Sequence, residues 1–317
     1  MEPNDSGDKG LVLLSVNGVP EPSSAQLLDG DNGELEAAGK AYLKQGGLAK
    51  WYIPRAKLRI PHRAGRCFMG ELLGTAVLVI FGCSAAGQVT LGSGERGGMT
   101  QINIGWAMAV TFGVITGFPL SHGHINPSWS IVRCIQGALP WCLLPVYIGG
   151  QCVGAFIGAA IVHLNFYNAI GAFHGNESWS VTTLAIYAPL ARPDSAGLLD
   201  CFYNQMLGAG LLFLLAMMLL DKKLGFAMEG VPLAFALGGV LAALTAGLDF
   251  HPGSSTFNPA RDFMPRLFTV LAGWEWAVAF GPGWWIGIVA PTLGALLAGA
   301  VFNGLIAPNY SPNPMAP

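Results

Sequence analysis

Two short stretches decide the fold of this chain: TFNPARD at residues 256–262 and HINPS at residues 124–128. Each places an Asn-Pro pair at the start of an apolar run, which is typical of a helix N-terminus. Asn is a preferred N-cap because its side-chain oxygen accepts a backbone N–H, and Pro at the first helical position loses no hydrogen bond. We expect the NH2 groups of Asn126 and Asn258 to point away from their helices and to remain free to donate to another molecule.

The composition around these stretches is typical of a membrane protein. Of the 317 residues, 52% are hydrophobic and 11% are charged, whereas soluble domains average about 25% charged residues. The net charge of −2 gives no indication of a nucleic-acid partner. The six cysteines lie in or beside apolar segments without metal-ligand spacing. We therefore expect no metal site and no cofactor.

Six apolar segments approach the roughly 20 residues that a helix needs to cross a bilayer. The two Asn-Pro pairs lie outside these segments, and each begins an apolar run too short to cross, at residues 129–139 and 263–271. Half-helices of this kind occur in membranes only where they are buried in protein or line a water-filled cavity. The six segments are about 67–87, 101–120, 143–166, 199–220, 230–250 and 284–306.

The two halves of the chain also repeat. GELLG at residues 70–74 corresponds to NQMLG at residues 204–208, and Asn126 corresponds to Asn258 at nearly the same offset. With three spans in each half, about 64–166 and 199–306, the copies must have opposite orientations. An inverted repeat places its unusual elements near the middle of the membrane, at the interface between the repeats.

The distribution of basic residues predicts the orientation. Lys and Arg collect at residues 50–66, before the first span, and in the turn at 222–223; such residues accumulate on the cytoplasmic side. We therefore expect a multi-pass protein of the plasma membrane with both termini in the cytoplasm. Residues 1–63, acidic and rich in Gly and Ser at their start, are predicted to be a disordered tail, and residues 307–317 a short C-terminal tail. Asn176 begins an N-glycosylation triplet in an outer loop.

The pairing of the two boxes predicts a pore rather than an active site. Two helix N-termini that meet, each carrying roughly half a positive charge, repel cations, while two Asn donors hold a passing oxygen atom. Arg261 lies about one turn beyond Asn258, and an arginine within a membrane indicates a functional site; the alternative is a structural ion pair with Asp262. No catalytic triad, metal box or phosphate loop is present, so we do not expect an enzyme.

These residues resemble a known family. The paired boxes, Glu71 in the first span and the run NPARDFMPRLF at 258–268 resemble the major intrinsic proteins, the aquaporins, and the second box is similar to that of the aquaglyceroporin branch. The resemblance covers about residues 64–306. It implies an all-α fold of six transmembrane helices plus two re-entrant half-helices in an inverted repeat, and a homotetramer in the lipid bilayer. The pore boxes would be Asn126, Pro127, Ser128, Asn258, Pro259 and Ala260.

The resemblance also implies the permeants and a selectivity filter. It predicts a passive channel for glycerol, other small polyols and water that excludes ions and protons. The filter would contain Arg261, Trp106, Ser255 and, from the fifth span, Ala246 or, with inserted residues, Ala243. Trp106 would form an apolar plate opposite the donors of Arg261; the alternative is an aromatic side chain that faces lipid.

Several positions depart from the family pattern. Ser128 stands where Ala is usual. Asn204 is expected at the position of the family's acidic residue in the fourth span, which would weaken the support of one pore loop, while Glu71 is kept. Asp262 is expected to support the loop. His122 is an additional histidine beside His124, and either is a possible pH sensor near neutral pH.

Two other functions remain open. A water-selective channel shares the same boxes, and a membrane-junction or interaction protein of this fold would conduct poorly. A permeability measurement separates all three.

Overall fold

The computed structural model describes residues 59–93, 95–173, 179–189, 197–224, 226–248 and 256–310. The chain divides into residues 1–59 and residues 60–317, and the description below concerns the second unit. The predicted tail up to residue 58, the predicted filter residue Ser255 and the predicted glycosylation site Asn176 lie outside the described residues.

Six helices in the described part of the chain are long and apolar enough to cross a membrane. They match the six predicted segments, with ends that differ by a few residues. A short 3-10 helix, Trp141–Leu143, leads into the third, and a π-helical turn, Phe302–Ile306, follows the last before a 3-10 turn, Ala307–Asn309. The long helices are α4 (Arg63–Leu91), α5 (Met99–Ser121), α7 (Leu144–Ala172), α9 (Leu198–Leu220), α10 (Gly230–Leu248) and α13 (Ile286–Val301).

The two predicted half-helices are present. They are α6 (Pro127–Ile135) and α11 (Pro259–Leu271), each starting directly after its box Asn. α6 ends at Ile135, earlier than the predicted residue 139, because the backbone turns at Gly137, whose φ is +73°. A left-handed glycine just beyond a helix is a common termination signal.

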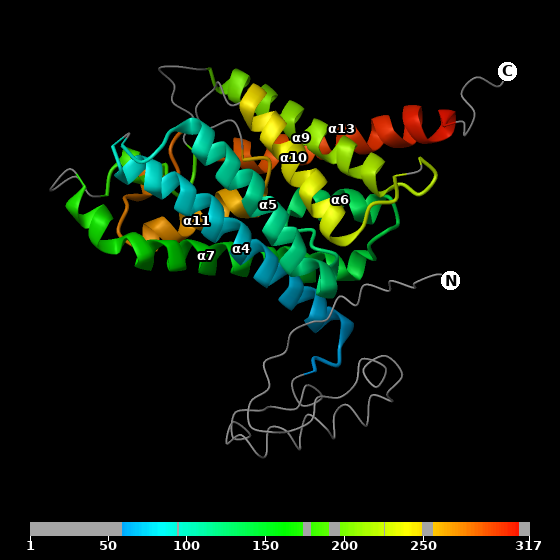
Figure 1. The fold of residues 1–317 in the computed structure, drawn as a ribbon, viewed down its shortest axis with the longest axis horizontal. Coiled ribbons are helices and arrows are strands. Elements are labelled where there is room, and N and C mark those ends of the chain that lie inside the picture. Colours follow the sequence, from blue (N-terminus) through cyan, green and yellow to red (C-terminus); the bar gives the residue numbers. More distant parts are fainter. Residues whose placement is uncertain are drawn as a thin grey trace, which may run out of the picture. The chain divides into compact units, whose positions relative to one another are not determined.

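The arrangement of the helices is an inverted repeat (Figure 1). α4 packs against α5 and α7, and the corresponding helix of the second half, α9, packs against α10 and α13. α5 and α10 contact each other and join the halves, and each half-helix contacts both α7 and α13. The predicted fold class is therefore confirmed.

Glycines allow the closest helix crossings. A Cβ atom at Gly154 of α7 would lie 2.2 Å from the carbonyl oxygen of Leu72, and one at Gly294 of α13 would lie 2.1 Å from that of Met206. Such separations leave no room for a side chain. Leu72 and Met206 occupy the same position in the GELLG and NQMLG stretches, so the repeat seen in the sequence is also a repeat of backbone packing.

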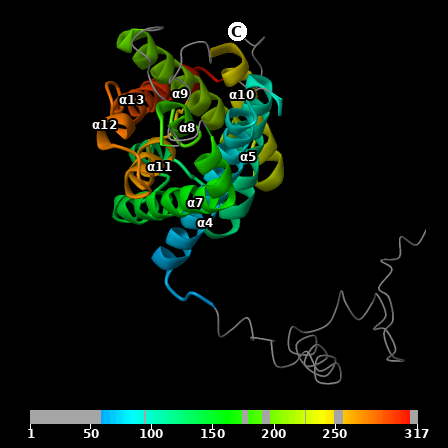
Figure 2. The ribbon, with the colours of Figure 1, turned by 90° about the vertical axis from the view of Figure 1, so that its left-hand side faces the viewer.

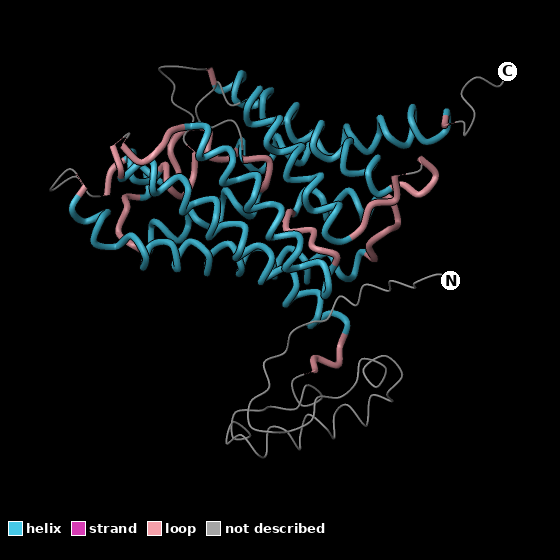
Figure 3. Tube along the Cα trace, viewed as in Figure 1, coloured by secondary structure: helices cyan, strands magenta, loops and turns pink. Residues whose placement is uncertain are grey.

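Two short helices were not predicted. α8 (Val181–Leu184) lies in the long loop after α7, and α12 (Trp276–Ala279) follows α11. Figure 2 shows α8, α11 and α12 near the same end of the helices, and Figure 3 shows pink loops at that end. Trp274 and Tyr187 are buried between these segments, so this end of the molecule has its own aromatic core.

Candidate functional site

Each box Asn caps its half-helix as predicted. The side-chain oxygen of Asn126 accepts the N–H of Ser128 at 3.0 Å, and that of Asn258 accepts the N–H groups of Ala260 and Arg261 at 3.1 and 3.3 Å. Pro127 and Pro259 occupy the first helical positions. The caps therefore fix the direction of both side-chain NH2 groups.

The NH2 groups do not remain wholly free, and this corrects the expectation from the sequence. Asn126 Nδ2 donates to the carbonyl of Phe257 at 2.8 Å, and Asn258 Nδ2 donates to the carbonyl of Ile125 at 2.7 Å. Each box thus holds the loop of the other. A primary amide carries two N–H groups, so one hydrogen of each can serve the opposite loop and the second can serve a solute.

The residue before each box Asn has an unusual backbone. Ile125 has φ +46° and Phe257 has φ +48°. A bulky or β-branched residue in this left-handed region is strained and persists only where the surroundings over-determine it. Here the crossed Asn bonds and the buried polar groups described next supply that constraint, and the strained turn aims each carbonyl at the other box.

Glu71 supports the first loop. Its carboxylate accepts the N–H groups of His124 and Ile125 at 2.9 and 2.7 Å, the Ser121 hydroxyl at 2.6 Å and the Gln151 amide at 2.7 Å. All four partners donate, which matches an ionised carboxylate, an acceptor on both oxygens. The predicted structural role of Glu71 is the one that these contacts describe.

Gln205, not Asn204, supports the second loop. Gln205 Oε1 accepts the N–H of Phe257 at 3.0 Å, and its amide nitrogen contacts the Thr256 hydroxyl at 2.7 Å. Asn204 instead donates to the carbonyl of Leu248 at 2.6 Å. The expectation for Asn204 was wrong by one position, since GELLG and NQMLG place Gln205, not Asn204, opposite Glu71.

The two boxes face a cavity of about 390 Å³. Its wall is largely apolar along α4, α5, α9 and α10, while Asn126, Asn258 and Arg261 supply polar groups. One end, called the inner mouth below, carries charged side chains. The lining residues there are Arg63, His122, Lys222 and Glu229.

Arg261 and Trp106 lie together and not on opposite walls. The guanidinium carbon of Arg261 is 4.0 Å from the centroid of the Trp106 ring, and both residues line the cavity. A cation over an aromatic face is attracted by the ring quadrupole. Trp106 therefore faces the cavity, not lipid, and it orients the arginine.

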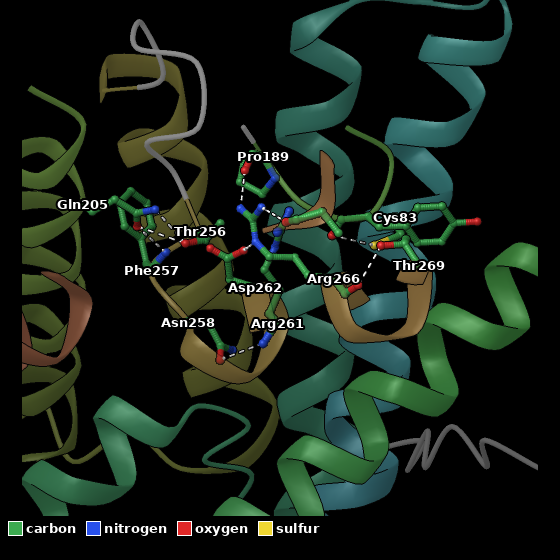
Figure 4. A network of polar contacts seen from close by, with 12 residues as sticks. Cys83, Pro189, Gln205, Thr256, Phe257, Asn258, Arg261, Asp262, Arg266 and Thr269 are labelled. Atoms are coloured by element: carbon green, nitrogen blue, oxygen red, sulfur yellow. Dashed lines mark hydrogen bonds and ion pairs between the residues drawn. The ribbon is translucent and has the colours of Figure 1, made fainter. Parts of the chain in front are cut away.

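Asp262 pairs with Arg266 and anchors α11 (Figure 4). The Arg266 Nε lies 2.5 Å from the Asp262 carboxylate, and its other nitrogens donate to the carbonyls of Ala279, at 2.9 Å, and Pro189. Both side chains are buried. One guanidinium thus joins the half-helix to α12 and to the loop after α8, directly beside Arg261.

The fifth-span position differs from the prediction. Thr245 of α10 lines the cavity, whereas Ala243 and Ala246 are exposed and do not line it. A helix turns 100° per residue, so a shift of one residue moves a side chain off the cavity face. The sequence could not decide which residue of the fifth span faces the cavity. The stretch before the second box has no helical period, so the number of inserted residues could not be counted.

The two histidines differ in environment. His122 is exposed at the inner mouth, whereas His124 is half-buried in the loop between α5 and α6, with Nδ1 3.1 Å from the Ser130 hydroxyl. Burial, followed by the positive charges of Arg133 and His122, lowers the pKa of His124 to about 3. His124 therefore stays neutral near physiological pH and is not a candidate pH sensor.

Trp129 and Arg133 are cavity residues that the sequence analysis also missed. Trp129 and Arg133 both lie on α6 and line the cavity on its inner side. Their i, i+4 spacing on a half-helix could have indicated a shared face. Among the described residues, no group of three or more His, Cys, Asp or Glu side chains is arranged to hold a metal ion.

Comparisons with known proteins agree with this geometry. Residues 61–302 match the family model described as Major intrinsic protein. Human Aquaporin-9 is 35% identical over 252 residues, covering 78% of this chain and 84% of that protein. Aquaglyceroporin-2 of Rhizophagus irregularis is 33% identical over 262 residues, covering 81% and 79%. The crystal structure of the aquaglyceroporin from Plasmodium falciparum superimposes with a TM-score of 0.70 at 24% identity, covering 77% of this chain and 98% of that one. It has the same fold.

Proposed function

Because the chain belongs to the major intrinsic protein family, whose members are membrane channels and not enzymes, we propose that it passes glycerol, other small polyols and water, and that it excludes ions and protons. The observation that carries the proposal is a cavity in which Asn126, Asn258 and Arg261 supply polar groups to an otherwise largely apolar wall. Relatives named as aquaglyceroporins support the polyol assignment.

The wall suits a molecule with one polar edge and one apolar edge. Glycerol carries hydroxyl groups along one side and C–H groups along the other. Arg261 is a permanently charged donor with five N–H groups, and the second hydrogens of the box amides lie further along the path. The apolar side chains opposite them contact the carbon backbone. A solute of this pattern replaces its hydration shell without losing hydrogen bonds.

Cations meet a barrier of fixed positive charge. Two half-helices begin beside the crossed asparagines, and each N-terminus carries roughly half a positive charge. Arg261, a residue that is 7% exposed, adds a full charge in poorly solvated surroundings. A cation that enters loses hydration and gains only repulsion.

The test is a permeability measurement on purified protein in liposomes. Stopped-flow light scattering under water and glycerol gradients should show fast entry of both, with no proton leak recorded by an internal pH dye. Arg261→Val should admit cations while solute flux persists. Fast water flux with glycerol excluded would identify a water-selective channel, and neither flux would favour a junction or interaction protein.

The filter composition is part of this proposal. Arg261, Trp106 and Thr245, together with Ser255 beyond the described residues, would form it. Trp106→Ala should relax selectivity for larger polyols while conduction persists, because the aromatic plate that orients Arg261 is removed. Unchanged selectivity would remove Trp106 from the filter.

Topology and assembly are proposed with it. A multi-pass arrangement with both termini in the cytoplasm, Asn176 outside and glycosylated, and a homotetramer in the plasma membrane follows from the basic residues and the family. Glycosidase treatment should shift the mobility of the wild type and not of Asn176→Gln, and protein in mild detergent should have the mass of four subunits. Cleavage of the N-terminal tail by protease added outside intact cells would reverse the orientation.

A further inference from the structure

The inner half of the cavity contains an aromatic wall that the sequence did not reveal. Trp129 stands three residues after Asn126, the same position that Arg261 holds after Asn258. Its ring stacks on that of Phe213, with centroids 5.5 Å apart and planes at 19°, and both residues line the cavity. The first half of the repeat therefore places a tryptophan where the second half places its arginine.

Arg133 lies one turn further along α6. Its guanidinium carbon is 5.4 Å from the centroid of the Trp129 ring, and its Nη1 donates to the side chain of Gln136 at 2.9 Å. Gln136 in turn contacts the sulfur of Met217. The guanidinium is thus held against the indole on the wall of the cavity, beside the inner mouth.

The arrangement repeats the chemistry of the other end. There, Arg261 lies over Trp106 at 4.0 Å. At both ends a planar cation that carries several N–H donors lies over an indole, and both residues of each pair line the cavity. An arginine in the last turn also stabilises a helix through its dipole, but any cation in that turn does so. The dipole requires neither a planar group over an indole nor a place on the cavity wall.

We propose that Trp129 and Arg133, the inner pair, form a second solute-selecting site that takes neutral polyhydroxylated molecules of about the size of glycerol. The inference rests on the proposed function, because it concerns the same permeants. The indole contacts the C–H edge of the solute, and the guanidinium donates to its hydroxyl groups. The stacked Trp129 and Phe213 rings limit the size of solute that reaches Asn126.

The experiment uses the full-length protein in liposomes, with water, glycerol and a linear five-carbon polyol as probes. Trp129→Val removes the aromatic wall. Arg133→Lys keeps the charge at the helix end but removes the planar donor group. Ile135→Val is the matched control, because Ile135 lies on the same half-helix and is exposed away from the cavity. Reconstituted amount and elution profile are compared for every variant.

Each variant should change a different permeability ratio. Arg133→Lys should lower the ratio of glycerol to water permeability about three- to tenfold, the effect of one lost hydrogen bond along the path. Trp129→Val should raise the ratio of five-carbon polyol to glycerol permeability by about fivefold or more. Ile135→Val should match the wild type.

The remaining outcomes overturn the proposal. A purely structural role would reduce the amount of folded protein, or all permeabilities in parallel, and leave both ratios unchanged. If the protein conducts glycerol and both variants keep the wild-type permeability ratios, the proposal for the inner pair is refuted and the proposed function stands. A wild type that passes no polyol would refute the proposed function itself, and the inner pair with it.

Discussion

The two halves of the channel reach the same backbone geometry by different chemistry. In the first half, the carboxylate of Glu71 accepts four donors and Ser130 contacts His124 and Gln151. In the second half, the neutral amide of Gln205 supports the loop, and Asp262, the counterpart of Ser130, pairs with Arg266. The strained residues before each Asn nevertheless have φ values of +46° and +48°.

The two halves differ in the position of their buried carboxylate. The first half keeps a single negative group directly behind the pore loop, satisfied by donors alone. In the second half, the buried carboxylate is Asp262 on the half-helix, where it pairs with Arg266. The uncharged amide of Gln205 supports the loop. At Gly287, which packs against the Asp262 carboxylate, a Cβ atom would lie 1.7 Å from that carboxylate. This glycine therefore makes room for the ion pair.

The largest expected effect follows from removing the first carboxylate. Glu71→Ala leaves two backbone N–H groups and two side-chain donors without their acceptor, and should cost roughly 6 kcal/mol of stability, because hydrogen bonds to a charged group contribute more than neutral ones. Gln205→Ala should cost roughly half as much. Thermal unfolding in detergent measures both, and equal losses would contradict the difference drawn between the halves.

Breaking the ion pair of the second half should come next. Asp262→Ala removes the carboxylate that pairs with the buried Arg266 guanidinium, and it should lower the free energy of unfolding by about 3–5 kcal/mol. The matched change in the first half, Ser130→Ala, removes only neutral hydrogen bonds and should cost about 1 kcal/mol. The comparison uses the same unfolding measurement. An Asp262→Ala protein as stable as Ser130→Ala would show that the pair contributes no more than neutral hydrogen bonds.

Substitutions at the two glycine crossings should lower stability by similar amounts, because the helices pack equally closely in both halves. Gly154→Ala and Gly294→Ala each force a Cβ atom against a backbone carbonyl, and each should cost about 1–3 kcal/mol through overpacking. Unfolding temperatures of the two variants, with the exposed Gly239→Ala as control, check this. A large effect at only one crossing would show that the packing is not equivalent.

The smallest expected effect is a pH dependence confined to the first half. The pKa of His124 is about 3 in the folded protein and near 6.5 in an unfolded chain. Because the folded value is the lower one, its contribution to stability is complete above pH 6.5 and declines as the pH falls toward 3. The loss should be about 1 kcal/mol one pH unit below 6.5.

His124→Gln serves as the control for this pH effect. The wild type should lose more of its unfolding temperature than His124→Gln between pH 7.5 and 5.5. Any change of glycerol flux over the same range should persist in His124→Gln. Identical stability profiles for wild type and His124→Gln would contradict the assignment.

The sequence by itself determined the architecture. Two Asn-Pro pairs outside six apolar segments, with GELLG repeated as NQMLG, were enough to predict the six long helices, the half-helices and their inverted order. These features are local: N-cap preference, proline at the first turn and the length of an apolar run act through neighbouring residues. The same signals placed both box asparagines and Arg261 on one cavity.

Only the tertiary structure decided which side chains meet. The crossed bonds from Asn126 and Asn258 and the contact of Arg261 with Trp106 join residues from the two halves of the chain. Helix rotation decides that Thr245, and not Ala243 or Ala246, lines the cavity, and that both residues of the inner pair line it. Their contacts depend on helix rotation and on the spacing between packed helices. An error of one residue turns a helical side chain by 100°, and no local pattern in the chain fixes that angle.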